Sequence, residues 1–320
     1  MRTDTPDNIT VIGAGLIGAS WTALFLAHGH RVCVHDVAPG FEARVRSELA
    51  RIKPTLLALG LTLGDDHHND RLSFEPDLAK AVREADFVQE CGPERIAFKR
   101  QLWSQVEQHC PATALLLSSS SGLTASRQAK GMRTPHRMLV GHPFNPPHLI
   151  PLVEVVPGQQ TLPDAVDAAM RFYTSLGKKA ILVKKEIPGF VANRLQAAVI
   201  RESVSLVQQG VITAGDLDDV MTHSLGIRWA VGGPFISAHL GGGPGGIKAF
   251  FKQFGSGLQL LWLHSRLRPV LLTQGTRDNL DAALQGMVQG ASVAELESAR
   301  DQQQLALLTA LQTSKAPAHD

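Results

Sequence analysis

The sequence is poor in cysteine, and its few cysteines are not arranged as metal ligands. Cys33, Cys91 and Cys110 form no CxxC pair and no other metal-ligand spacing. Two of them lie in strand-like runs, as buried reduced thiols of cytosolic proteins do. The opening residues MRTDTPDN are polar and carry two aspartates, unlike a secretory signal. We therefore expect a cytoplasmic protein.

A surplus of charge and an uninterrupted apolar span are also missing. The net charge of +2 gives no electrostatic case for binding nucleic acid or an acidic membrane surface. Two long uncharged runs, residues 11–27 and 229–247, contain three and seven glycines, so neither is a credible membrane span. With 44% hydrophobic residues, a chain of 320 residues can form two globular domains with a sizeable core.

The first apolar run is followed by the pattern of a dinucleotide-binding turn. Residues 9–12 read as a strand, and residues 13–18 spell GAGLIG. A helical pattern over residues 19–27 and a second strand over residues 31–35 follow, and the second strand ends at Asp36. A lone GxGxxG is weak evidence, but this order of strand, turn, helix, strand and acid is specific.

Each residue of this turn has a physical task. Gly13 makes the tight turn, Gly15 admits a pyrophosphate, and Gly18 lets the helix pack on the strand. The N–H groups and partial positive charge at the start of the helix attract phosphates. Asp36 can bond a ribose 2′-hydroxyl and would repel a 2′-phosphate, which favours NAD over NADP.

Later strand-like runs end in polar residues. Residues 112–117 run into the serines SSSS and Gly122, and residues 138–141 run into His142. Because open α/β sheets bind ligands at the carboxyl ends of their strands, we expect the glycine turn, the serines and His142 in one crevice. The serines alone would also fit a turn with local hydrogen bonds.

His142 opens a proline-rich passage, HPFNPPHLIPLVE. Its prolines favour a stiff loop, and residues 152–156 after the loop read as a strand that contains Glu154. Such a loop can return the carboxylate to the imidazole, an arrangement that orients a base and stabilises its protonated form. The alternative is a structural histidine with a solvent-facing glutamate, and this passage alone leaves both open.

Two other polar groups are less informative. Glu94 and Lys99 flank the start of a helix expected over residues 95–108, where a surface ion pair is an equally good interpretation. His67 and His68 lie in a polar loop without ligand spacing around them, so we assign no metal site.

The hydrophobic pattern changes from strands to helices after residue 183. A long helix over residues 190–209 follows a Pro-Gly pair and carries Asn193 in its first turn. The fold class is therefore predicted to be α/β. A Rossmann-type doubly wound sheet over residues 1–185 is followed by an all-helical C-terminal domain over residues 186–320.

Taken together, the motifs resemble the 3-hydroxyacyl-CoA dehydrogenase superfamily. The resemblance covers residue 9 to about residue 262 and rests on GAGLIG, DFVQEC, SSSSGL, HPFNP, LVEVV and KEIPGFVANR. GHPFNPPHLIPLVEVVPG, AHLGGGPGGIKAFFKQFG and VAELESARDQQQLALL are similar to the branch of L-carnitine dehydrogenases and the lambda-crystallin/L-gulonate 3-dehydrogenase group. Carnitine dehydrogenases usually carry Asp at the position of Asn193 and Val at that of Pro147.

The resemblance implies a role for each matching residue. His142 matches the catalytic base, and Glu154 matches its carboxylate partner. Ser121 and Asn193 match the residues that bond the substrate oxygen near the nicotinamide. Beside Gly13, Gly15 and Gly18, the matches to NAD contacts are Leu16, Ile17, Asp36, Glu94 and Lys99. A homodimer built through the helical substrate and dimerisation domain is also implied.

The resulting hypothesis is an NAD-dependent oxidoreductase that oxidises a small L-3-hydroxy acid to its 3-keto form. The substrate would be carnitine-like or gulonate-like, and His142 would remove the hydroxyl proton while hydride passes from C3 to NAD. One alternative is the same chemistry on an acyl-CoA. The other is a catalytically silent NAD-binding protein, as the lens crystallins of this branch suggest.

Overall fold

The computed structural model describes residues 7–63, 70–267 and 269–313. Two expectations involve residues outside these ranges. The first concerns the polar opening segment, which includes residues 1–6, and the second concerns His67 and His68, to which no metal was assigned. The chain divides into two compact units, one of Met1–Asn193 with Arg300–Ala310 and one of Arg194–Ala299 with Leu311–Asp320. The predicted domains, residues 1–185 and 186–320, divide the sequence at a different point and stay a prediction.

The described part of the first unit is built on an eight-stranded sheet. Its strands are β1 (Asn8–Ile12), β2 (Arg31–His35), β3 (Leu72–Phe74), β4 (Phe87–Glu90), β5 (Leu115–Ser118), β6 (Met138–Pro143), β7 (Leu152–Pro157) and β8 (Lys179–Leu182). They lie in the order β3-β2-β1-β4-β5-β6-β7-β8. Neighbouring strands are parallel except β6 and β7, which are antiparallel. This order confirms the predicted Rossmann-type sheet.

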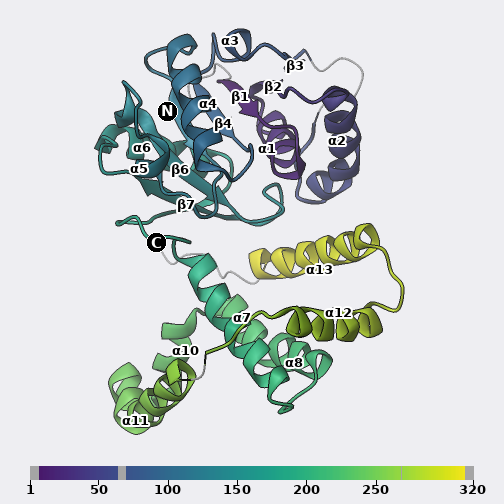
Figure 1. The fold of residues 1–320 in the computed structure, drawn as a ribbon, viewed down its shortest axis with the longest axis vertical. Helices are drawn as coiled ribbons and strands as arrows, with labels where there is room; N and C mark the ends of the chain where they lie inside the picture. Colours follow the sequence, from purple (N-terminus) through teal and green to yellow (C-terminus); the bar gives the residue numbers. More distant parts are fainter. Residues whose placement is uncertain (1–6, 64–69, 268, 314–320) are drawn as a thin grey trace. The chain divides into compact units, whose positions relative to one another are not determined.

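Helices cover both faces of this sheet (Figure 1). They are α1 (Leu16–Ala27), α2 (Phe41–Ala58), α3 (Leu78–Ala81), α4 (Ile96–His109), α5 (Ala125–Gln128) and α6 (Pro163–Ser175), with a 3-10 turn η1 (Pro135–Arg137). One core cluster joins α1, α2 and α6 to one face, and a second joins α4 and α5 to the other. Successive residues alternate between the faces, so Leu116 and Leu117 belong to different clusters.

Every described element of the second unit is helical, as predicted. Its elements are α7 (Ala192–Gln208), α8 (Ala214–Val220), a π-helical turn η2 (Met221–Leu225), α9 (Gly226–Val231), α10 (Pro234–Gly241), η3 (Gly243–Gly245), α11 (Gly246–Leu267), α12 (Gln274–Val288) and α13 (Val293–Thr313). The first residues of α7 and the later part of α13 belong to the first unit. Among the described residues, no helix has the length and apolar character needed to cross a membrane.

Several element boundaries differ from the sequence-based expectation. Helix α1 begins at Leu16, three residues earlier than expected, because the glycine turn leads directly into it. Strand β6 extends to Pro143, so His142 lies inside the strand and not after it. Helix α7 begins at Ala192 rather than at Phe190, because Phe190 adopts a left-handed backbone conformation.

Candidate active site

The glycine turn between β1 and α1 is closed on one side and open on the other. Gly13 has a φ of +102°, and a Cβ there would lie 2.8 Å from the carbonyl oxygen of Cys91. A Cβ on Gly18 would lie 1.8 Å from the Gly13 carbonyl oxygen, so only glycine lets α1 pack this closely. Among the described residues, a Cβ on Gly15 would meet no atom within 4 Å, and no side chain caps α1 there. The turn therefore fits the phosphates of a dinucleotide, which bind backbone N–H groups at a helix start.

Asp36 fixes this turn from the carboxyl end of β2. Its Oδ2 accepts a hydrogen bond from the Ala14 N–H at 2.7 Å, and its Oδ1 accepts one from the Ala38 N–H at 2.9 Å. Leu16 and Ile17 begin α1 directly after the turn, and the Leu16 side chain is half exposed. The predicted cofactor residues of β1, α1 and β2 therefore surround one turn.

Lys99 lies in the interior of the first unit. Its Nζ donates to both carboxylate oxygens of Glu90 at 2.7 Å and lies 3.5 Å from Oε2 of Glu94. Glu90 also accepts hydrogen bonds from the Ser118 hydroxyl and the Gly92 N–H, each at 2.7 Å. Lys99 and Glu90 are both almost fully buried. A contact of Lys99 with NAD stays a prediction. The contact of Lys99 with Glu94 links Lys99 to the serine run, which Glu94 binds.

Glu94 organises the serine run that follows β5. Its Oε1 accepts hydrogen bonds from the Ser120 hydroxyl at 2.5 Å and from the N–H groups of Gly122 and Leu123 at 3.0 and 3.2 Å. Burial raises the pKa of Glu94, but these donors and the nearby charge of Lys99 outweigh burial and hold the pKa below its ordinary value. The charged Glu94 thus ties the serine run to the end of β4.

His142 and Glu154 face each other across the antiparallel pair of β6 and β7. The strand register places them opposite one another, and His142 Nδ1 lies 2.9 Å from Glu154 Oε2. Their residues are only 4% and 2% exposed. The rings of Phe144 and Phe190 lie 4.7 and 5.5 Å from the imidazole, between ring centroids. The alternative of a solvent-facing glutamate is therefore wrong.

The second carboxylate oxygen of Glu154 binds the backbone at the start of α7. Oε1 accepts hydrogen bonds from the N–H groups of Val191 at 3.0 Å and Ala192 at 2.9 Å. Burial raises the pKa of Glu154, but the hydrogen bonds from His142, Ala192 and Val191 outweigh burial and lower the pKa overall. An ionised carboxylate only accepts hydrogen bonds, so Nδ1 of His142 carries the proton and Nε2 of the neutral ring does not.

Ser121 and Asn193 also meet. Asn193 Nδ2 donates to the backbone carbonyl of Ser121 at 2.9 Å. The N–H of Ala192, the residue before Asn193, donates to Glu154. This hydrogen bond links the pair of His142 and Glu154 to the pair of Ser121 and Asn193. The structure thus brings together all four residues that were predicted to take part in catalysis.

Three residues that sequence reasoning missed anchor the loop between β6 and β7. Ser20 Oγ lies 2.8 Å from His148 Nδ1 and also accepts the His148 backbone N–H at 2.8 Å. Lys178 Nζ donates to the carbonyl oxygens of Pro147 and Ile150, the latter at 2.8 Å. Burial lowers the pKa of Lys178 to about 7. Ser20 and His148 are 128 positions apart, so no local pattern signals their contact.

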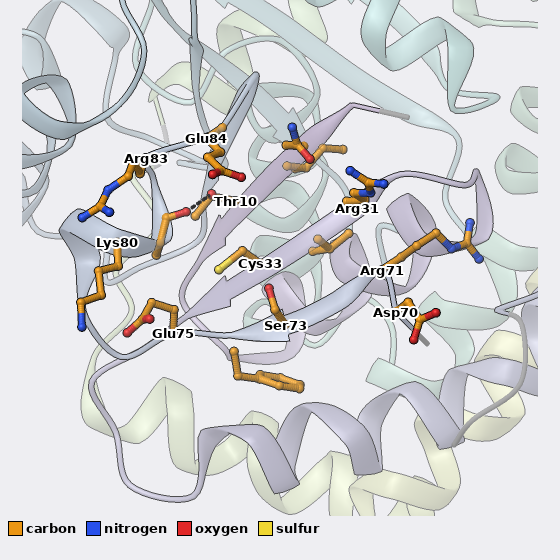
Figure 2. Close-up of a pocket in the computed structure, with 16 residues that line it drawn as sticks. Thr10, Arg31, Cys33, Asp70, Arg71, Ser73, Glu75, Lys80, Arg83 and Glu84 are labelled. Atoms are coloured by element: carbon orange, nitrogen blue, oxygen red, sulfur yellow. Dashed lines mark hydrogen bonds between the residues drawn. The ribbon is translucent and has the colours of Figure 1, made fainter. Parts of the chain in front are cut away.

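A cavity of about 410 Å³ lies elsewhere on the first unit, against β1, β2, β3 and α3 (Figure 2). Thr10, Cys33 and Ser73 line it from register-paired positions of three neighbouring strands. Basic and acidic side chains are mixed around it, for example Arg83 beside Glu84. The described residues that line it include none of the predicted site residues, so it is separate from the candidate active site.

Comparison with known families identifies the class and then the family. The model of the 3-hydroxyacyl-CoA dehydrogenase NAD-binding domain matches residues 8–187, and the model of the C-terminal domain matches residues 189–271. The first match includes the open glycine turn and Asp36, which makes the protein an NAD-dependent oxidoreductase. With both domains matched in order, the chain belongs to the 3-hydroxyacyl-CoA dehydrogenase family.

Relatives with a named activity match nearly the whole chain. An L-carnitine dehydrogenase from Pseudomonas sp is 42% identical over 305 residues, covering 95% of this chain and 94% of the relative. The L-carnitine dehydrogenase of Pseudomonas aeruginosa is 43% identical over 308 residues, with 95% and 94% covered. Among solved structures, 5-formyl-3-hydroxy-2-methylpyridine 4-carboxylic acid 5-dehydrogenase, an NAD+-dependent dismutase, aligns with a TM-score of 0.74 at 27% identity, covering 96% of this chain and 99% of that one.

Proposed function

We propose that the protein oxidises the 3-hydroxyl group of a small L-3-hydroxy acid, carnitine-like or gulonate-like, to the 3-keto form. The pair of His142 and Glu154 carries the proposal, because a carboxylate 2.9 Å from Nδ1 orients the imidazole to accept a proton at Nε2. The relatives named L-carnitine dehydrogenases support a substrate of this size and chemistry.

In this proposal His142 is the catalytic base. Its Nδ1–H is donated to Glu154, so the Nε2 lone pair accepts the proton of the substrate hydroxyl. Glu154 is ionised and buried beside the ring, where its charge stabilises the imidazolium that forms. NAD+ supplies the hydride acceptor when it is bound.

Ser121 and Asn193 are assigned to the substrate oxygen. The bond from Asn193 Nδ2 to the Ser121 carbonyl holds the two residues together. The Ser121 hydroxyl and the second amide N–H of Asn193 are then donors for an oxygen on which charge develops. Glu154 fixes the position of Asn193 relative to His142, because it accepts the N–H of Ala192, the residue before Asn193.

The same proposal places NAD over the glycine turn. The residues assigned to the cofactor are Gly13, Gly15, Leu16, Ile17, Gly18, Asp36, Glu94 and Lys99. Each carboxylate oxygen of Asp36 accepts one backbone N–H, which leaves a lone pair on each for a ribose hydroxyl. Lys99 would act indirectly, through the charge that it presents to Glu94.

We expect purified protein to reduce NAD+ with a free L-3-hydroxy acid. The screen pairs L-carnitine, L-gulonate, 3-hydroxybutyrate and 3-hydroxybutyryl-CoA with NAD+ and with NADP+, and follows the absorbance of the reduced nicotinamide. Because the charge of Asp36 repels a 2′-phosphate, kcat/KM with NADP+ should be at least about tenfold lower than with NAD+. Turnover of the CoA ester alone would support the acyl-CoA alternative, and NAD+ binding without any turnover would support the silent one.

We also propose a cytoplasmic homodimer built through the helical unit. The free thiols of Cys33, Cys91 and Cys110 suit a reducing compartment. Exposed large apolar side chains are concentrated in the helical unit, among them Leu195, Ile227, Phe235, Leu240, Leu260 and Trp262. Exposed apolar patches of this kind mark protein interfaces. Light scattering should therefore give the mass of two chains, and the mass of one chain at micromolar concentration would contradict the dimer.

A further inference from the structure

Phe190 has an unusual backbone conformation for a bulky residue. Its φ is +48°, in the left-handed region, and it follows Gly189, whose φ is +74°. In that region the Cβ of a large side chain crowds its own backbone, so the conformation persists only where surrounding contacts impose it. Phe190 is also fully buried. A strained residue in the interior, directly before α7, calls for a physical cause.

The conformation of Phe190 directs the next two backbone N–H groups at Glu154. Val191 and Ala192 donate to Glu154 Oε1 at 3.0 and 2.9 Å, while Oε2 of the same carboxylate binds His142. With right-handed φ at Phe190, the peptide groups that follow would turn in another direction. The left-handed turn therefore holds one end of the carboxylate whose other end orients the imidazole.

The ring of Phe190 acts on His142 from a second direction. Its centroid lies 5.5 Å from that of the imidazole at an interplanar angle of 57°, and Phe144 approaches the same imidazole at 4.7 Å and 62°. Tilted aromatic contacts of this kind restrict the rotation of the ring between them. Among the described residues, Glu154 is the titratable residue that forms a hydrogen bond with the His142 side chain.

We propose that Phe190 is a positioning residue for the base: its left-handed backbone aims two N–H groups at Glu154, and its ring restrains His142. This inference rests on the proposed role of His142. This role requires no contact of Phe190 with substrate or cofactor, because Phe190 acts on the rate through the geometry of the imidazole and carboxylate. A residue with this role affects kcat more than the affinity for NAD+.

Phe190→Leu and Phe190→Gly test the proposal. Leucine keeps bulk but removes the ring, and glycine accepts a positive φ but removes the ring as well. The low-field proton resonance of the His142 Nδ1–H, assigned by its loss in His142→Gln, reports the bond to Glu154 without any turnover. We expect both Phe190 variants to lose or shift this resonance and to lower kcat about tenfold or more, with the NAD+ dissociation constant within about threefold of wild type.

Phe172→Leu is the matched control. Phe172 is a buried aromatic residue of α6 that stacks on Phe87 in the other core cluster of the same unit. Phe172→Leu should lower thermal stability as a Phe190 variant does, but keep the resonance and kcat.

The outcomes separate this inference from the proposed function. Retention of the resonance in either Phe190 variant, with kcat within about threefold of wild type, overturns the role of Phe190. Absence of turnover in the wild-type protein contradicts the proposed function instead. In that case the resonance still decides whether Phe190 positions the pair of His142 and Glu154.

Discussion

Replacing His142 with glutamine should lower kcat about 10²–10⁴-fold and leave the affinity for NAD+ within about threefold of wild type. Glutamine cannot accept the substrate proton as Nε2 does. It still offers an N–H to Glu154, so the buried carboxylate keeps a hydrogen-bond partner and the fold is preserved. Steady-state kinetics with the best substrate of the screen and calorimetric titration with NAD+ measure the two quantities separately.

His109→Gln controls for the chemical change itself. His109 is exposed at the end of α4, outside the site, and its replacement should leave both quantities unchanged. Unimpaired NAD+ binding by His142→Gln would show that the glycine turn is intact. If that variant kept kcat within about tenfold of wild type, His142 would not be the base and the proposed mechanism would be wrong.

The strands and the glycine turn at the start of the chain can be predicted from the sequence because their signals are local. Strand β2 spans Arg31–His35, the same residues as expected, since a strand buried in a parallel sheet is a short apolar run. The tasks assigned to Gly13 and Gly18 agree with what a Cβ would meet at each position. By contrast, β3 and α6 were not predicted, and β3 is only three residues long, too short for a periodic pattern.

The pairing of His142 with Glu154 was predicted for the right reason. A proline-rich loop between two strand-like runs returns the chain, and the antiparallel register then places residues 142 and 154 opposite each other. Their catalytic roles are not tested by this geometry and stay predictions. The sequence held no comparable signal for Ser20 and His148, which meet only through the tertiary fold.

The start of α7 shows where local signals fail. A Pro-Gly pair before an apolar pattern indicates a helix start, so the helix was expected from Phe190. The helix begins only at Ala192 because Phe190 is left-handed, and Glu154, distant in sequence, accepts the N–H groups of Val191 and Ala192. The backbone conformation at this helix start depends on contacts across the fold, which a local pattern does not reveal. It occurs at Phe190, the residue that we assign to position His142.

Lys99 was expected beside the cofactor, and its burial with Glu90 leads to the largest expected effect on stability. Lys99→Met should lower the unfolding free energy of the first unit by about 3–5 kcal/mol, because it leaves Glu90 buried without its counter-charge. The hydrogen bonds from Ser118 and Gly92 remain, but they do not neutralise the carboxylate. Hydrogen exchange of the amides in β4 and β5 in increasing urea reports this unit alone.

The double variant Lys99→Met/Glu90→Gln tests whether Lys99→Met loses stability because Glu90 is left as an unpaired buried charge. If the deficit comes from an uncompensated buried carboxylate, removing that charge should restore a large part of the stability, since a buried pair often contributes little net free energy. A double variant as unstable as Lys99→Met would instead attribute the deficit to lost packing of the lysine stem.

Lys80→Met on the exposed side of α3 should change stability by no more than about 0.5 kcal/mol. Because Lys99 also lowers the pKa of Glu94, NAD+ affinity measured on the same variants would show whether the buried pair supports the serine run.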